Sequence, residues 1–207
     1  MKSLSLSAAG ALLLSSTCLY ASAEAASLNL QIIDAAGWPS SEAVAFLEPA
    51  SGQTLPKHQH SAQIEQRGRR FAPLVTVVQT GTAISFPNRD SVRHQVYSFS
   101  APKIFELKLY SGAGGDPIIF DKPGTVIIGC NIHDQMAAFI QVVDTPYFAK
   151  SDASGKLSID NILPGKYQLK IWHSSIPASI PMPVQPVTIA NTDLALPILL
   201  TFKTEKK

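Results

Sequence analysis

The chain lacks a sustained helical period, and turn-forming residues divide it into short apolar runs. Beyond residue 24, β-branched and aromatic stretches such as Leu28 to Ile33 and Tyr167 to Trp172 alternate with glycine, proline, asparagine and aspartate. A period of two places successive side chains on opposite faces of a strand, whereas an amphipathic helix needs a period of about 3.6. We therefore expect an all-β protein built from sandwiches or barrels.

The expected strands share a β-branched or aromatic content and a turn signal at each end. They are Leu28 to Ile33, Ala43 to Leu47, Leu74 to Val78, Ala83 to Phe86, His94 to Phe99, Phe105 to Leu109, Ile118 to Phe120, Gly124 to Ile128, Ala138 to Val143, Leu157 to Ile159, Tyr167 to Trp172 and Pro186 to Ile189. Prolines gather between Pro177 and Pro186. Because proline removes a backbone donor, this stretch is expected to be an edge strand or a loop.

The first residues have the composition of a secretory signal. Lys2 supplies a positive start, Leu4 to Leu19 is rich in leucine and alanine, and Ala21-Ser22-Ala23 offers a small-residue cleavage site. Residues 1–23 are expected to be a signal peptide, so the protein is expected to be periplasmic or secreted. No later segment reaches about 18 consecutive apolar residues, and integral membrane association is not expected. Lipid attachment at Cys18 is disfavoured, because Ser15 stands where a lipobox normally carries leucine.

Signal cleavage leaves one of the two cysteines, Cys130, which then has no partner for an intramolecular disulfide. A lone exported thiol is an oxidation liability, an intermolecular partner or a metal ligand. The formal net charge of +2 gives no bulk attraction for nucleic acid or an anionic membrane. The cluster of Arg67, Arg69 and Arg70 is interpreted as a solvated turn.

The segment Cys130-Asn-Ile-His133-Asp-Gln-Met136 places a thiolate, an imidazole and a thioether within seven residues. A cysteine and two histidines form the strong trigonal ligands of a copper site, and a methionine is its weak axial ligand. His94 supplies the second histidine, because a β-sandwich can bring the end of its strand beside this loop. The sequence therefore predicts one mononuclear copper site per chain, built from His94, Cys130, His133 and Met136.

Several alternative interpretations exist, and the copper site is favoured over them because the four residues occur together at a ligand spacing. Each of the four residues alone would more often be a core or satisfied polar side chain. Zinc is the nearest metallic rival, but it gains little from Met136, and Asp134 could only replace that methionine as an oxygen ligand. His58 and His60 lie in a polar loop and are interpreted as solvated, with a weak secondary copper site as the alternative. His173 ends an alternating strand and is not expected to be a ligand of the main centre.

The segment from about Phe71 to Val143 resembles a cupredoxin of the plastocyanin and amicyanin type. The C-x2-H-x2-M spacing is amicyanin-like, and Phe86-x-Asn88-x-Asp90-x-x-x-His94-x-Val96 fits the family's approach to its first ligand. The resemblance implies copper ligation by the four residues named above. It also implies that His133 is the electron port, within an apolar patch to which Ile132, Pro87 and Ala137 could contribute.

The chain departs from the family's pattern at two positions. Small cupredoxins commonly carry asparagine or serine after the first histidine, where this chain has Gln95, and an aromatic residue shortly before the cysteine, where it has Ile127, Ile128 and Gly129. The ligand set survives both departures. They put in doubt the surroundings of the ligands, which tune a reduction potential through hydrogen bonding and burial.

The C-terminal stretch resembles a carboxypeptidase-regulatory-like or transthyretin-like β-sandwich, and Leu28 to Leu47 reads like the first strands of the same module. We expect a discontinuous second sandwich, with residues 24–60 and 144–207 enclosing a cupredoxin domain at 61–143, and with Ser51 to Arg70 as a polar connection. The whole chain also resembles larger periplasmic proteins of the methylamine-utilisation or plastocyanin-like kind.

One-electron transfer between redox protein partners is the expected function, because four protein ligands leave no obvious position for a substrate. Phosphate-loop, G-x-S-x-G and H-E-x-x-H patterns are absent from the sequence, and an enzyme is not expected. Arg89 and Arg93 could steer an acidic partner. The alternatives are a copper-carrying or copper-sensing protein without electron transfer, and a structural or ligand-binding sandwich that has lost its metal.

Overall fold

The computed structural model describes residues 25–52, 55–57, 60–177 and 179–204. The signal-peptide prediction, Cys18 and His58 therefore lie outside the described residues. The described chain forms 17 strands and contains no helix, which confirms the prediction of an all-β protein. In the same residues we find no helical segment of the length and hydropathy that crossing a bilayer requires.

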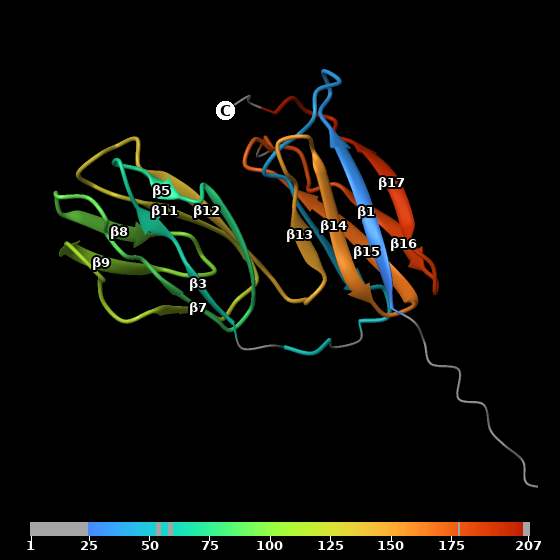
Figure 1. The fold of residues 1–207 in the computed structure, drawn as a ribbon, viewed down its shortest axis with the longest axis horizontal. Helices are drawn as coiled ribbons and strands as arrows, with labels where there is room; N and C mark the ends of the chain where they lie inside the picture. Colours follow the sequence, from blue (N-terminus) through green and yellow to red (C-terminus); the bar gives the residue numbers. More distant parts are fainter. Residues whose placement is uncertain (1–24, 53–54, 58–59, 178, 205–207) are drawn as a thin grey trace, which may run out of the picture.

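Strands from the two ends of the chain form one pair of facing sheets, here called the terminal sandwich (Figure 1). Its strands are β1 (Ala26–Ile33), β2 (Val44–Pro49), β13 (Phe148–Lys150), β14 (Lys156–Ile162), β15 (Gly165–Trp172), β16 (Val184–Ile189) and β17 (Leu194–Leu199). One sheet has the order β14-β1-β17, with β1 antiparallel to β14 and parallel to β17. The other has the order β13-β2-β15-β16 and is antiparallel throughout.

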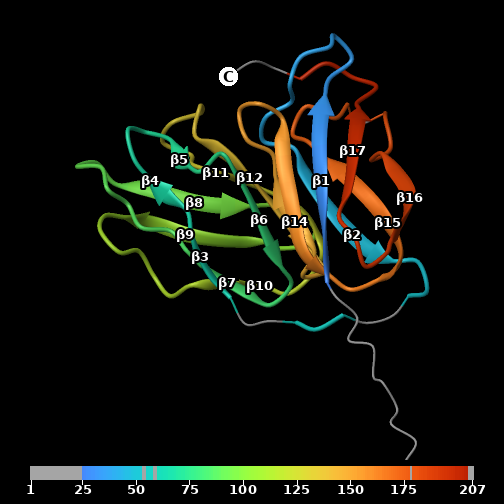
Figure 2. The same ribbon diagram turned by 45° about the vertical axis from the view of Figure 1, so that its right-hand side comes forward.

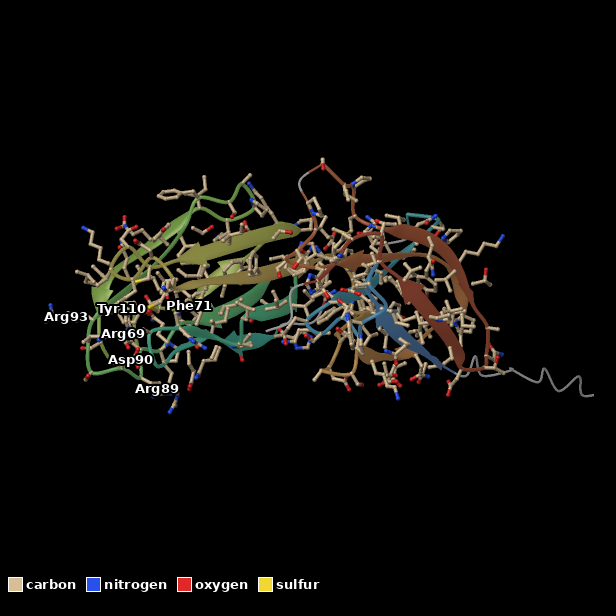
Figure 3. The ribbon with its side chains drawn as sticks, turned by 90° about the horizontal axis from the view of Figure 1, so that it is seen from above. Arg69, Phe71, Arg89, Asp90, Arg93 and Tyr110 are labelled. Atoms are coloured by element: carbon tan, nitrogen blue, oxygen red, sulfur yellow. The ribbon has the colours of Figure 1, made fainter. Side chains whose placement is uncertain are left out.

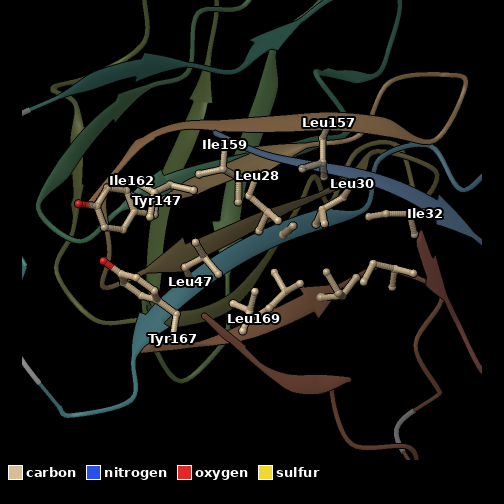
Figure 4. Packing of buried hydrophobic residues seen from close by; sticks show 14 of the residues in the cluster. Leu28, Leu30, Ile32, Leu47, Tyr147, Leu157, Ile159, Ile162, Tyr167 and Leu169 are labelled. Carbon is tan, nitrogen blue, oxygen red and sulfur yellow. The ribbon is translucent and has the colours of Figure 1, made fainter. Parts of the chain in front are cut away.

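The core of the terminal sandwich follows from strict alternation along β1. Leu28, Leu30 and Ile32 turn inward and are at most 3% exposed. They meet Leu47 of β2 and Leu169 of β15 from the facing sheet (Figure 4). Packing two such inner faces removes both from water, and this burial of apolar area is the main favourable contribution to folding.

Residues between these two sets of strands form the central sandwich. Its strands are β3 (Ser61–Gln63), β4 (Glu65–Gln66), β5 (Phe71–Ala72), β6 (Val75–Gln79), β7 (Thr82–Ser85), β8 (His94–Ser98), β9 (Phe105–Tyr110), β10 (Ile118–Phe120), β11 (Gly124–Gly129) and β12 (Ala137–Val143). A five-stranded sheet of order β6-β12-β11-β8-β9 faces a three-stranded sheet of order β10-β7-β3. The hairpin of β4 and β5 closes one end. Cys130 and Met136 lie in the core between these sheets.

The two sandwiches pack against each other through the outer faces of one sheet from each (Figure 2). Val44 and Phe46 of β2 meet Val75 of β6 and Val143 of β12 in a third buried cluster. The ring of Trp172 lies 5.8 Å from that of Phe139, centroid to centroid. Strand β2 is consequently buried on both faces, which explains why its sequence is a continuous apolar run rather than an alternating one.

All twelve expected strands are present, with bounds that differ by a few residues. Five strands were not predicted from the sequence: β3, β4, β5, β13 and β17. The prediction that Ser51 to Arg70 is a connection was wrong for its second half, because β3 and β4 lie within it. The proline-rich stretch ends in β16, which is the edge strand of its sheet and pairs on one side only. There a missing donor at Pro186 costs the sheet little.

The strand pairings are compatible with the proposed division of the chain at residues 24–60, 61–143 and 144–207. Both β1 and β2 pair with strands that follow residue 147, and neither pairs with a strand of the central sandwich. We keep these boundaries as a proposal about domains.

Replacing Leu169 by alanine is predicted to lower the free energy of unfolding by about 2–5 kcal/mol, because a fully buried leucine loses its contacts and leaves a cavity. The matched control is Leu199→Ala, since Leu199 is 72% exposed; it should change stability by about 0.5 kcal/mol or less. Urea denaturation measures both. Equal losses in the two variants would contradict the described core.

Candidate metal centre

His94 is the first residue of β8 and points into the central sandwich. Burial alternates along this strand, and the side chain of His94 is fully buried, as is that of Val96. The segment before it is held by Asn88, whose amide donates hydrogen bonds to the carbonyls of Val92 and Tyr110. These hydrogen bonds hold the segment that leads into β8 and so help to position His94 at the start of the strand.

The Asp90 carboxylate contacts His94 at the ring nitrogen that lies away from Cys130. His94 Nε2 lies 2.8 Å from Asp90 Oδ2. The same carboxylate accepts the backbone N–H groups of Gly68 at 2.6 Å and Arg69 at 2.9 Å. Gly68 and Arg69 have φ values of 61° and 56°, as the centre of a type I′ hairpin turn requires, and so turn their N–H groups toward Asp90.

These contacts fix the charge of Asp90 and the tautomer of His94. Burial raises the pKa of Asp90, but the hydrogen bonds from Arg69, His94 and Gly68 together hold it below its usual value. An ionised carboxylate can only accept a hydrogen bond, so we assign the ring proton of His94 to Nε2. Nδ1 is then left with a free lone pair on the side facing the loop that follows β11.

The loop between β11 and β12 carries the other predicted ligands. The backbone N–H of Cys130 donates to the carbonyl of Met136 at 3.2 Å, and the N–H of Met136 donates to the carbonyl of His133 at 2.9 Å. These bonds fold seven residues into a closed turn. Cys130 and Met136 are 3% and 1% exposed, and Cys130 is a free cysteine.

Three of the predicted donor atoms lie close together between the strand and the loop. The donor atoms of His94, Cys130 and His133 all lie within 4.8 Å of one another, and Cys130 Sγ is 4.0 Å from His94 Nδ1. The two imidazole rings stand 5.1 Å apart at 65°. His133 Nδ1 is buried and has no hydrogen-bond partner among the described residues.

Among the described residues, the buried Nδ1 atom of His133 lacks a hydrogen-bond partner, and this is the strongest indication that a metal ion fits between the three side chains. A buried polar atom without a partner costs about 1–3 kcal/mol, so its persistence indicates a ligand that satisfies it. A thiolate and two imidazoles suit copper or zinc and offer no oxygen for a hard cation. The three side chains therefore fit a soft or borderline metal ion.

The other described residues that the sequence offers as metal ligands do not belong to this group of three donors. Asp134 is exposed and is not part of the group of three donors. His60 is exposed beside β3. His173 lies in the terminal sandwich, where its ring contacts the carbonyl of Ser41 and accepts the N–H of Ser175. Met136 is buried at the end of the ligand loop, and its role as a fourth ligand remains a proposal.

The two departures from the cupredoxin pattern have local explanations. Gln95 lies on the outer face of β8, where its amide donates to Glu106, so it does not join the ligand segments. Gly129 pairs with Tyr97 of β8, and a Cβ atom at Gly129 would lie 2.9 Å from the Tyr97 ring. An aromatic ring therefore does lie beside the residue before the cysteine, but it comes from the neighbouring strand. The sequence alone did not identify Tyr97, or the contact between Asp90 and the 67–70 turn.

Part of the chain is similar in structure to a copper-containing nitrite reductase, a cupredoxin and an amicyanin. Two-fifths of the chain, 40%, resembles a copper-containing nitrite reductase from Thermus scotoductus, at 26% identity and a TM-score of 0.37, over only 22% of that enzyme. A purple cupredoxin from Nitrosopumilus maritimus is covered over 99% of its length, at 22% identity and a TM-score of 0.34. A reduced amicyanin mutant is covered over 80%, at 15% identity and a TM-score of 0.36.

No known family model matches the chain, and no curated protein matches it. The similar structures share less than half of this chain at low TM-scores. The side chains of His94, Cys130 and His133 are therefore the main support for a metal centre.

Replacing Asp90 by asparagine is predicted to raise the dissociation constant for copper by about 10- to 100-fold, because an uncharged amide no longer holds the His94 ring as strongly. Competition with a chelator of known affinity measures the change. Asp121→Asn is the matched control, since Asp121 forms an exposed ion pair with Lys103. An unchanged constant in the Asp90 variant would show that the carboxylate does not position the ligand.

Proposed function

We propose that this protein is an exported type 1 copper protein that transfers single electrons between redox partners. The observation that carries the proposal is that three soft or borderline donor atoms lie within 4.8 Å of one another. One of the three side chains, His133, has a buried nitrogen, Nδ1, with no hydrogen-bond partner in the described part of the chain. Cys130, His94 and His133 would hold the ion as strong ligands, and Met136 would be the weak fourth.

The surroundings of the three donors favour electron transfer over bond-changing chemistry. Bound copper would supply a centre that alternates between two oxidation states. His94 and Cys130 are buried, and the carboxylate of Asp90 restrains the His94 ring. With Met136 as the fourth ligand the centre would have no open position for a substrate, so we propose no substrate and no enzymatic reaction there.

His133 is the proposed electron port. It is partly exposed, while its Nδ1 atom is buried. Ile132, at 51% exposure, lies beside it in the chain, and Ala137 is exposed at the other end of the loop. Pro87, which was expected in this apolar patch, is buried and does not contribute to it. Weak and transient redox encounters use small interfaces, so a few exposed apolar side chains around His133 would suffice.

A partner protein and export belong to the same proposal. A periplasmic or secreted location rests on the sequence of residues 1–23. Copper carriage without electron transfer is the competing function, because it would use the same ligands. The two functions differ in whether the bound ion changes oxidation state reversibly at a potential that proteins can reach.

Protein-film voltammetry of the copper-loaded chain tests this difference. We expect one reversible one-electron wave with one copper ion per chain, and no such wave in Cys130→Ser, which lacks the thiolate. A protein that binds one copper ion but gives no reversible wave would favour carriage. A protein that binds zinc but not copper would refute the proposal.

The same measurement examines Met136. Replacement by leucine should raise the reduction potential, because an apolar side chain no longer donates to the oxidised ion while the volume is nearly kept. Met182→Leu is the matched control, since Met182 packs at the contact between the two sandwiches. Equal potentials in the wild type and Met136→Leu would remove this residue from the ligand set.

A further inference from the structure

All five arginines of the chain lie between residues 67 and 93, although lysines occur throughout it. We call the surface formed by Arg67, Arg69, Arg70, Arg89 and Arg93 the arginine end. Figure 3 places Arg69, Arg89 and Arg93 together at the end of the central sandwich that points away from the terminal sandwich. All five side chains are exposed.

The arginine end adjoins the candidate metal centre directly. The N–H of Arg69 donates to the Asp90 oxygen that also binds His94. Arg93 precedes His94 in the chain, and Arg89 precedes Asp90. The 67–70 turn, interpreted from the sequence as a solvated turn, is therefore connected to His94 by two hydrogen bonds through Asp90.

The charge of this surface is only partly neutralised. Arg67 and Arg89 share Glu65 at 3.2 and 3.3 Å. Asp90 is directed inward to His94 and the turn, and Asp134 is the exposed acid of the ligand loop. The arginines that form no ion pair within the described residues are Arg69, Arg70 and Arg93.

We propose that the arginine end is the docking surface for an acidic redox protein. The proposal rests on the electron-transfer function above and names the chemistry of its partner. Exposed apolar side chains accompany these arginines: Val92 is 38% exposed between Arg89 and Arg93, and Ile132, which is 51% exposed, adjoins His133 in the ligand loop. An apolar centre with a charged rim, enriched in arginine, is the anatomy of a protein interface rather than of a nucleic-acid groove.

Charge complementarity would act mainly on the rate of encounter. Oppositely charged surfaces raise association rates by about 10- to 1,000-fold at low ionic strength. Because His133 and the arginine end belong to the same region, an acidic partner attracted to it arrives near the electron port. One electron then passes from the partner, which is oxidised, to the oxidised copper form of this protein, which is reduced; no bond or proton is exchanged.

The test measures reduction of the oxidised copper-loaded protein by stopped flow, with reduced plant-type ferredoxin as the acidic protein donor and hexaammineruthenium(II) as a small cationic donor. The variant Arg69→Gln/Arg70→Gln/Arg93→Gln should slow the ferredoxin reaction about tenfold at low salt and speed the ruthenium reaction. Both differences should vanish near 1 M salt, where the Debye length is about 3 Å.

A matched triple variant separates local charge from net charge. Lys156→Gln/Lys166→Gln/Lys203→Gln removes the same three positive charges, from exposed positions of the terminal sandwich and the segment after it. It should change the ferredoxin rate by less than about twofold, since these charges lie on or after the strands of the terminal sandwich and not on the segments that carry the metal centre. Equal changes in the two triple variants, or an unchanged salt dependence in the arginine variant, would overturn the proposal.

A second arm needs no copper. Oxidised ferredoxin added to the metal-free chain should shift the backbone amide resonances of residues 67–70 and 89–93 in the NMR spectrum. These shifts would support the docking surface even if the chain proved to lack redox activity. Reversible voltammetry together with shifts confined to another surface would refute the docking surface and leave the proposed function intact. Binding of a DNA duplex through these arginines, without such shifts by ferredoxin, would also refute it.

Discussion

The hydrogen bond between Asp90 and His94 is the interaction on which the candidate metal centre depends. The Asp90 carboxylate joins three parts of the chain that are otherwise separate: the 67–70 turn, the segment before β8 and the imidazole of His94. A buried histidine can rotate unless its second nitrogen is held, and a hydrogen-bonded carboxylate is the strongest available restraint. The ring is consequently oriented before any metal ion arrives.

The terminal sandwich contributes to the same centre through packing. Strand β12 begins directly after the ligand loop. Its inner face is buried in the core of the central sandwich, and its outer face packs against the cluster that includes Val44, Phe46 and Trp172. A strand held on both faces resists local opening. The loop from Cys130 to Met136 is thus anchored at one end by a strand with two packed faces.

Sequence patterns predicted the fold class, the main strands and the ligand loop, because each depends on local alternation or spacing. Short pairings such as β3 and β4 carry too few apolar residues to be recognised, and β17 is interrupted by Pro197. The role of Asp90 was invisible because its partners at Gly68 and Arg69 lie more than 20 positions away. Likewise, Tyr97 lies beside Gly129 only through cross-strand pairing.

We propose that Cys130, His94 and His133 bind one copper ion through a thiolate and two imidazoles. The visible absorption spectrum of the oxidised, copper-loaded protein is the decisive measurement, because thiolate-to-copper charge transfer absorbs strongly there only when the sulfur is a ligand. We expect an intense colour that saturates at one copper ion per chain and is lost in Cys130→Ser. A colourless copper-loaded protein, or a colour that Cys130→Ser retains, would contradict it.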